Sequence, residues 1–179
     1  MKSLLSIHLV PPSPALRESF LCALREFQEE GLPWWFGGDL ETAEQDFAAF
    51  VSMRLADATL RSEEQVAKTH LWAVAEGRFV GRIAIHHGLN AARRRLGGHI
   101  GYDTVPSVRG QGVATQMLRQ ALPVALSLGL TEVLLTCDDT NLASIRVIER
   151  NGGVLRETRA LDGRGPLKRY YWIALGALR

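Results

Sequence analysis

Apolar residues recur at helical spacing in the first third of the chain. Ser13 and Pro14 predict a helix start, because serine caps a helix and proline suits its first turn. The apolar stripe that follows consists of Leu16, Phe20, Ala23, Leu24 and Phe27. Gly31 and Pro33 end this helix, and Asp39 is expected to cap a second one. The inner face of the second helix is formed by Leu40, Ala43, Phe47, Phe50, Val51 and Leu55.

Further along, apolar residues alternate with polar ones, which is typical of β-strands. Residues 70–75 and 79–86 flank the turn Glu76-Gly77-Arg78 and predict a hairpin. The other expected strands are residues 3–10, 98–105, 132–138 and 168–175. Helices are expected over residues 113–128 and 141–150, and a basic turn over residues 89–97. This order predicts one domain over residues 1–179, of the α/β (α+β) class, with a central mixed sheet flanked by helices.

Charge is unevenly distributed along the chain. Residues 1–70 hold six Lys or Arg against eleven Asp or Glu, whereas residues 71–179 hold fifteen against eight. An acidic half and a basic half favour two ligands of opposite charge, such as a cationic amine and a polyanionic cofactor. Chance clustering on solvated helix faces is the alternative explanation. The basic half lacks a helix-turn-helix or aromatic RNA-binding signature, so no nucleic-acid partner is expected.

Three features bear on where the protein works. No apolar run is long enough to span a bilayer, and His8 interrupts the apolar N-terminal stretch. Cys22 and Cys137 lie far apart, without the spacing of metal ligands. We therefore expect a cytoplasmic protein with no membrane contact and no metal. The oligomeric state stays open, with a homodimer among the options.

The residues from Arg109 to Ala114, R-G-Q-G-V-A, connect an expected strand to an expected helix. Gly110 and Gly112 lack Cβ atoms, so backbone N–H groups can converge on an anion at the positive end of the helix. A dinucleotide fingerprint would need a third glycine at Thr115, and a P-loop would need Gly-Lys-Ser/Thr, which the chain lacks. The sequence therefore favours a cofactor that carries phosphates.

This loop resembles the pyrophosphate loop of the GNAT superfamily of acyl-CoA-dependent N-acetyltransferases. Its pattern, Arg/Gln-x-x-Gly-x-Gly/Ala, is matched by Arg109, Gly112 and Ala114. The order of elements is similar to that of a GNAT domain over nearly the whole chain. The most similar branch is the bacterial one that includes N-terminal acetylating enzymes of ribosomal proteins. The features shared with that branch are Gly101-Tyr102 before the loop and Asn141-Leu142-Ala143-Ser144 at the start of a helix.

The resemblance implies that the chain transfers an acetyl group from acetyl-CoA to a small-molecule or peptide amine in a ternary complex. It also implies an interrupted strand, in which the free amides of Tyr102, Asp103 and Thr104 bind the pantetheine arm and the thioester carbonyl. The cofactor-binding residues expected from it are Tyr102, Asp103, Thr104, Arg109, Gly110, Gln111, Gly112, Val113, Ala114, Asn141 and Ser144.

A base is useful in such a reaction, because most amines are protonated near neutral pH. His99 is the first candidate, since it stands where the resembling branch often has Glu and a neutral imidazole can accept a proton. His86 and His87 are rivals on the neighbouring strand. Asp103 could orient His99 or hold a water molecule.

The proton donor departs from the commonest GNAT pattern. Many members have a tyrosine at the position of Ile148, so Ser144 is the candidate that replaces it, with helix capping as its alternative role. Trp34 and His87 are candidate residues of the acceptor side, although Trp34 could instead belong to a packed loop. The isoleucine leaves a second interpretation open, namely a non-catalytic acyl-CoA-binding or regulatory module of the same fold.

Overall fold

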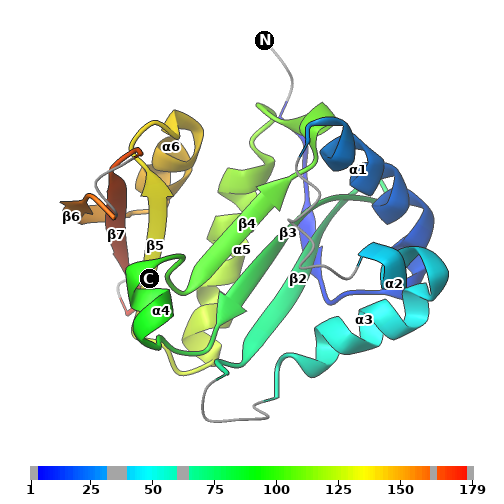
Figure 1. The fold of residues 1–179 in the computed structure, drawn as a ribbon, viewed down its shortest axis with the longest axis horizontal. Helices are drawn as coiled ribbons and strands as arrows, with labels where there is room; N and C mark the ends of the chain where they lie inside the picture. Colours follow the sequence, from blue (N-terminus) through cyan, green and yellow to red (C-terminus); the bar gives the residue numbers. More distant parts are fainter. Residues whose placement is uncertain (1–3, 32–39, 60–64, 162–164, 177–179) are drawn as a thin grey trace.

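The computed structural model describes residues 4–31, 40–59, 65–161 and 165–176. Its strands form two antiparallel sheets (Figure 1). The larger sheet has the order β1-β2-β3-β4, and the smaller one has the order β5-β7-β6. The strands of the larger sheet are β1 (His8–Val10), β2 (Lys68–Ala75), β3 (Arg78–His86) and β4 (Ile100–Thr104). Those of the smaller sheet are β5 (Glu132–Asp138), β6 (Val154–Arg159) and β7 (Lys168–Ala174).

The described helices surround the two sheets (Figure 1). They are α1 (Arg17–Glu29), α2 (Leu40–Gln45), α3 (Phe47–Ala56), α4 (Ala91–Arg95), α5 (Val113–Ser127) and α6 (Leu142–Arg150). Two short 3-10 helices, η1 (Pro14–Leu16) and η3 (Pro106–Val108), precede α1 and follow β4. No helix within the described ranges is long and apolar enough to cross a membrane.

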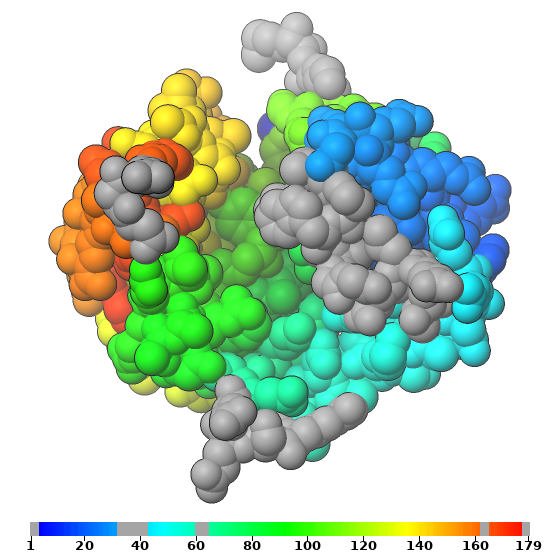
Figure 2. Space-filling model, viewed as in Figure 1, coloured from blue at the N-terminus to red at the C-terminus, as the bar shows by residue number. Residues whose placement is uncertain are grey.

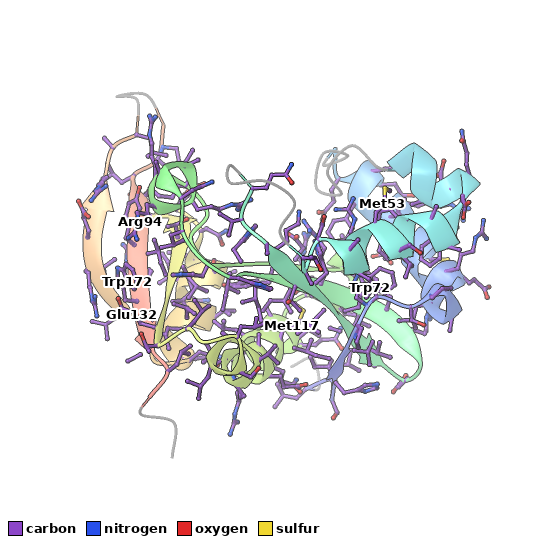
Figure 3. The ribbon with its side chains drawn as sticks, turned by 90° about the horizontal axis from the view of Figure 1, so that it is seen from below. Met53, Trp72, Arg94, Met117, Glu132 and Trp172 are labelled. Carbon is purple, nitrogen blue, oxygen red and sulfur yellow. The ribbon has the colours of Figure 1, made fainter. Side chains whose placement is uncertain are left out.

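Two hydrophobic cores result from the alternation of side chains along the strands. In β2, Leu71 and Ala73 belong to the core under α5, whereas Trp72 belongs to the core under α1 and α3. Trp72 stacks on Phe20, with ring centroids 4.9 Å apart, and Met117 of α5 is fully buried on the other face. Figure 3 shows Trp72 and Met117 in these two layers.

The expected class, an α/β domain with flanking helices, is confirmed, but several details differ. The strands form two antiparallel sheets instead of one mixed sheet. The expected second helix is divided into α2 and α3, because Asp46 caps α3 by accepting a hydrogen bond from the N–H of Ala49 at 2.9 Å. Asp39 lies outside the described residues. The first strand is shorter than expected, and residues 91–95 form a helix rather than a turn.

Strand β6 is absent from the expected order of elements. All six of its side chains are exposed, so the segment from Val154 to Arg159 carries no buried alternating face that a sequence could reveal. Its pairing with β7 decides its conformation, and the paired residues lie 9 (Arg159 and Lys168) to 18 (Val154 and Trp172) positions apart in the sequence.

Candidate functional site

Strands β4 and β5 separate from each other at one end (Figure 1). A single bridge between Gly98 and Leu135 joins the two sheets, and the N–H of His99 donates to the carbonyl of Leu134 at 2.7 Å. Gly98 has φ +63°, and a Cβ there would lie 2.3 Å from the oxygen of Leu134, so only glycine permits this approach. Beyond the bridge, β4 pairs only with β3, which leaves one edge of β4 open.

The open edge of β4 presents two of the three expected backbone amides. In antiparallel pairing, alternate residues turn their N–H groups toward the partner strand. The N–H of Val105 donates to the carbonyl of Val80 in β3 at 3.1 Å. By the same alternation Asp103 faces β3, whereas Tyr102 and Thr104 direct their N–H groups into the gap. The amide of Asp103 is therefore engaged in the sheet.

The loop before α5 has the geometry of an anion site. Gly112 is the N-cap of α5 and has φ +79°, a left-handed conformation that favours glycine. The N–H groups of a first helical turn lack acceptors inside the helix. Those of Val113, Ala114 and Thr115 also have no hydrogen-bond partner elsewhere in the described part of the chain. They are free to bind a negatively charged group.

A cavity of about 500 Å³ joins the open edge of β4, this loop and the start of α6. It lies in the region where Figure 2 shows the molecule hollowed between the yellow α6 side and the blue α1 side. Its lining residues are Phe27, Tyr102, Asp103, Thr104, Arg109, Gly110, Gly112, Val113, Ala114, Thr115, Asn141, Ala143, Ser144, Arg146, Val147 and Arg150. The structure thus brings ten of the eleven expected cofactor-binding residues to one cavity. The exception is Gln111, whose side chain turns back to the carbonyl of Ser107.

The side chains of Tyr102 and Ser144 meet in this cavity. Their hydroxyl oxygens lie 2.8 Å apart. Ser144 is available for this contact because Asn141 caps α6, accepting a hydrogen bond from the N–H of Ser144 at 3.0 Å. Burial raises the pKa of Tyr102 well above its ordinary value, so its hydroxyl stays protonated at physiological pH. Ile148, at the usual tyrosine position, is buried in the core.

Asp103 and Arg82 form a partly buried ion pair at the edge of the cavity. Their side-chain atoms Oδ2 and Nη2 lie 2.7 Å apart, and the side chain of Asp103 is 10% exposed. The two residues are opposite each other in the β3–β4 register. Burial raises the pKa of Asp103 above its ordinary value, although the positive charge of Arg82 acts in the opposite direction. The carboxylate is therefore a stronger base than an exposed aspartate.

Arg109 connects the loop to α1. Its Nη1 lies 2.8 Å from Oε1 of Glu30, and its Nε donates to the carbonyl of Thr104 at 3.2 Å. Glu26 holds the same region through the N–H and hydroxyl of Ser107, at 2.9 and 3.0 Å. The position of the loop thus depends on the C-terminal turn of α1.

His99 does not line the cavity. It is 6% exposed, and its Nδ1 accepts a hydrogen bond from the N–H of Leu134 at 2.8 Å. Burial lowers the pKa of His99, which favours the neutral ring with its proton on Nε2. Such a ring has no free lone pair for a second proton. Arg94 and Glu132, which affect this pKa, and Trp172, whose ring lies 6.3 Å away, are labelled in Figure 3.

His87, a candidate for the acceptor side, does not line this cavity. His87 follows β3, and its Nε2 lies 2.8 Å from the hydroxyl of Thr69. His86 is buried and lines a different cavity. Trp34 lies outside the described residues.

Sequence analysis missed two features of the cavity. Arg146 and Arg150 both line it from α6, and their spacing of four residues on one helix face was a signal that could have been used. The second feature is the hydroxyl of Tyr102. Its partner Ser144 lies 42 residues away, so no local pattern indicates the contact.

The Acetyltransferase (GNAT) domain model matches residues 7–154. Mycobacterium smegmatis RimJ, solved with CoA-disulfide, is 20% identical, with 96% of this chain and 83% of that chain covered and a TM-score of 0.71. YncA of Salmonella typhimurium, solved with acetyl-CoA, is 13% identical, with 94% of each chain covered and a TM-score of 0.63. A Salmonella typhimurium acetyltransferase that modifies the N-terminal serine of ribosomal protein L7/L12 is 15% identical, with 94% and 95% covered and a TM-score of 0.64.

These identities show a common fold and no more. No curated protein sequence matches the chain. The family model covers most of the chain, from β1 to the start of β6, and includes the loop, the open edge of β4 and the start of α6. The chain therefore belongs to the GNAT acetyltransferase family.

Proposed function

We propose that this protein transfers an acetyl group from acetyl-CoA to an amine acceptor by direct transfer in a ternary complex. Family membership supports the acetyl transfer. The observation that carries the proposal is the single cavity shared by the free N–H groups of the loop and the hydroxyl pair of Tyr102 and Ser144. An anion site and a proton-donating pair in one cavity suit a thioester that carries a diphosphate.

The residues present fit coenzyme A. The N–H groups of Val113, Ala114 and Thr115 would bind the diphosphate, helped by the positive end of α5. Arg146 and Arg150 supply positive charge on the α6 side. The open edge of β4 would hold the pantetheine arm, because an amide-bearing chain can pair with a free strand edge.

The bound thioester supplies an activated acetyl group. The N–H groups of Tyr102 and Thr104 point into the gap and would stabilise the charge that develops on its carbonyl oxygen. Preorganised donors of this kind contribute about 3 kcal/mol each to transition-state stabilisation. Because one hydroxyl of the Tyr102–Ser144 pair donates to the other, the remaining hydroxyl hydrogen would be donated to the departing sulfur.

We assign Asp103 as the general base that removes a proton from the amine acceptor. It is the one carboxylate among the described residues that line the cavity, and burial makes it more basic than usual. It would accept the proton directly or through a water molecule. His99, the first candidate from the sequence, would instead act as a structural link between the two sheets, since its Nδ1 already accepts a hydrogen bond.

A covalent route through cysteine finds no support in the geometry. Cys137 is 5% exposed and does not line the cavity, and burial raises the pKa of its thiol. Cys22 is exposed and lies on α1, away from the cavity lining. A nucleophilic thiol needs a lowered pKa and access to the substrate. Direct attack by the amine requires neither.

The acceptor class is a small-molecule or peptide amine. The assay that tests the proposal measures release of free CoA thiol from acetyl-CoA with a panel of amines that includes short peptides with free N-termini. Release that depends on the amine supports the transferase. Calorimetry with CoA is run in parallel. Binding of CoA without thiol release for any amine would instead favour the non-catalytic acyl-CoA-binding module.

A further inference from the structure

The outer edge of β1 faces a helix instead of another strand. β1 is the edge strand of the larger sheet and pairs with β2 on its other side. An edge strand presents a row of N–H and carbonyl groups that need hydrogen-bond partners. On this edge the N–H groups of Leu5, Ile7 and Leu9 all point toward α5 or the loop before it. The partners of this edge therefore come from the same part of the chain as the cofactor loop.

Two glutamines of α5 supply most of these partners. The carboxamide of Gln116 accepts a hydrogen bond from the N–H of Ile7 at 3.4 Å and donates to the carbonyl of Leu5 at 2.6 Å. One turn further along α5, Gln120 accepts from the N–H of Leu9 at 3.1 Å and donates to the carbonyl of Ile7 at 3.0 Å. Both side chains are partly buried, and neither lines the cofactor cavity. Each carboxamide thus takes the place of one peptide unit of a neighbouring strand.

The same segment touches the cofactor loop at its next N–H group. The N–H of Leu5 donates to the main-chain carbonyl of Gln111 at 3.1 Å, and in Figure 1 the segment begins beside the loop that leads into α5. A Cβ on Gly112 would lie 2.6 Å from Cδ2 of Leu4 and 3.8 Å from Nε2 of Gln116. The N-terminal segment and Gln116 therefore pack directly against the loop.

The contact with Leu5 fixes the direction of the peptide unit between Gln111 and Gly112. In a trans peptide the carbonyl and the following N–H point in opposite directions. The carbonyl of Gln111 points to Leu5, so the N–H of Gly112 points away from the N-terminal segment. Gly112 lines the cofactor cavity, whereas Leu5 and Gln111 do not. The N–H of Gly112 also has no hydrogen-bond partner in the described part of the chain, so it is free to bind an anion.

From these contacts we infer that Gln116 is a positioning residue of the cofactor site. It holds the segment from Leu5 to Ile7 on α5, so that the N–H of Leu5 keeps the N–H of Gly112 turned toward the diphosphate. The inference rests on the proposed binding of CoA at this loop. A donor that is oriented before the ligand arrives needs no ordering on binding, so its orientation affects affinity. Gln120 makes the same two kinds of hydrogen bond one turn further from the loop and serves as the matched control.

The test is calorimetry with CoA on Gln116→Met and Gln120→Met. Methionine keeps the length of the side chain but makes neither of the two hydrogen bonds. Gln116→Met is expected to weaken CoA binding about tenfold, the effect of losing one hydrogen bond to a charged group. Gln120→Met should bind CoA as the wild type does. Urea unfolding should show a similar loss of stability in both variants, because each loses two equivalent contacts.

Kinetics separate positioning from a general loss of structure. In Gln116→Met the KM for acetyl-CoA is expected to rise about tenfold while kcat is unchanged, since the loop is remote from the transferred acetyl group. Equal CoA affinities of Gln116→Met and Gln120→Met overturn the inference, whether both are normal or both are weakened. A lower kcat with an unchanged KM overturns it as well.

Replacing Leu5 by Pro tests the decisive contact and leaves Gln116 in place. Proline has no N–H, so the hydrogen bond to the carbonyl of Gln111 is lost. Ser6→Pro is the control, because the N–H of Ser6 makes no hydrogen bond within the described residues. CoA binding should weaken in Leu5→Pro and stay normal in Ser6→Pro. In 1H–15N spectra, CoA should shift the amide signal of Gly112 in the wild type, and less in Leu5→Pro at saturating CoA.

The outcomes for this inference and for the proposed function differ. A wild-type protein that does not bind CoA overturns both. Normal CoA affinity in Gln116→Met and Leu5→Pro, beside a wild type that binds CoA, overturns the positioning role alone. Calorimetry and NMR give these results even if no amine acceptor is found.

Discussion

The hydroxyl oxygens of Tyr102 and Ser144 lie 2.8 Å apart, across the gap between β4 and α6. One residue comes from a strand edge and the other from the first turn of a helix, and both line the cofactor cavity. The family's usual tyrosine position is occupied by buried Ile148. The pair thus brings a phenol to the cavity from a different element, β4.

Replacing Tyr102 by Phe is expected to lower kcat by about a hundredfold. This is the lower end of the rate contribution that a positioned proton donor usually makes. The ring remains, so the affinity for CoA should change little. Tyr170→Phe is the matched control, because its hydroxyl donates to the carbonyl of Arg95 at 2.7 Å, away from the cavity. Steady-state kinetics and calorimetry check both variants. A Tyr102→Phe enzyme with unchanged kcat would remove the hydroxyl from the mechanism.

The loop before α5 is tested by Gly112→Asp. The carboxylate would enter the anion site from a position with φ +79°, and its Cβ would lie 2.6 Å from Cδ2 of Leu4. Like-charge repulsion of several kcal/mol is expected to reduce CoA affinity by more than a hundredfold. Gly129→Ala is the control for backbone strain, since Gly129 has φ +87° with open space around it, at the other end of α5. Calorimetry with CoA should show normal affinity for that control. Retained affinity in Gly112→Asp would place the diphosphate elsewhere.

The ion pair of Arg109 and Glu30 is expected to compete with cofactor binding. The two side chains are 46% and 36% exposed, so their pairing is worth at most about 1 kcal/mol. Glu30→Gln releases Arg109 toward the cavity and should strengthen CoA binding by up to about fivefold. Glu29→Gln removes the same charge from the neighbouring position and serves as the control. Weaker binding by Glu30→Gln would show that the pair instead holds the loop in its binding conformation.

Asp103→Asn is expected to lower kcat strongly while CoA affinity is retained. Burial raises the pKa of Asp103 above its ordinary value, so the wild-type rate should fall on the acid side as the carboxylate becomes protonated. The variant should lose this acid limb. The pH dependence of thiol release, measured for both proteins, tests the assignment. Persistence of the same acid limb in Asp103→Asn would transfer the role to another group.

Three buried histidines should make the fold sensitive to acid. The pKa values of His70 and His86 are lowered to about 4 and about 3, and that of His99 is lowered as well, in each case mainly by burial. Below pH 6.5, the unfolded chain therefore binds protons that the folded chain does not. Stability is lost as the pH falls from about 6.5 toward these lowered values, by at most about 1.4 kcal/mol per pH unit for each histidine.

Urea unfolding between pH 7.5 and 4.5 measures this slope. His86→Gln should reduce the slope, because one of the proton-binding groups is gone. His8→Gln alters an exposed histidine of β1 and should leave the slope as it is. A stability that is constant down to pH 4.5 would contradict the neutral, buried state of the three rings.

Local interactions explain why several elements can be predicted from the sequence. The glycines of the loop, the apolar stripe of α5 and the cap of α6 at Asn141 each depend on neighbours within a few residues, so their patterns predict both the elements and most of the cofactor cavity. The free N–H groups at the start of α5 follow from helix geometry alone.

The contacts between side chains of distant elements depend on the tertiary packing. The imidazole of His99 is a group that can act as a base. Where β4 meets β5, however, its ring nitrogen Nδ1 accepts a hydrogen bond from the N–H of Leu134, 35 residues away. The contact of Tyr102 with Ser144 and that of Leu5 with the carbonyl of Gln111 also depend on how elements pack across the sheets. A sequence pattern shows how residues are spaced along one helix or strand. These contacts join residues of different elements, and the distance between them is set by how several helices and strands pack together.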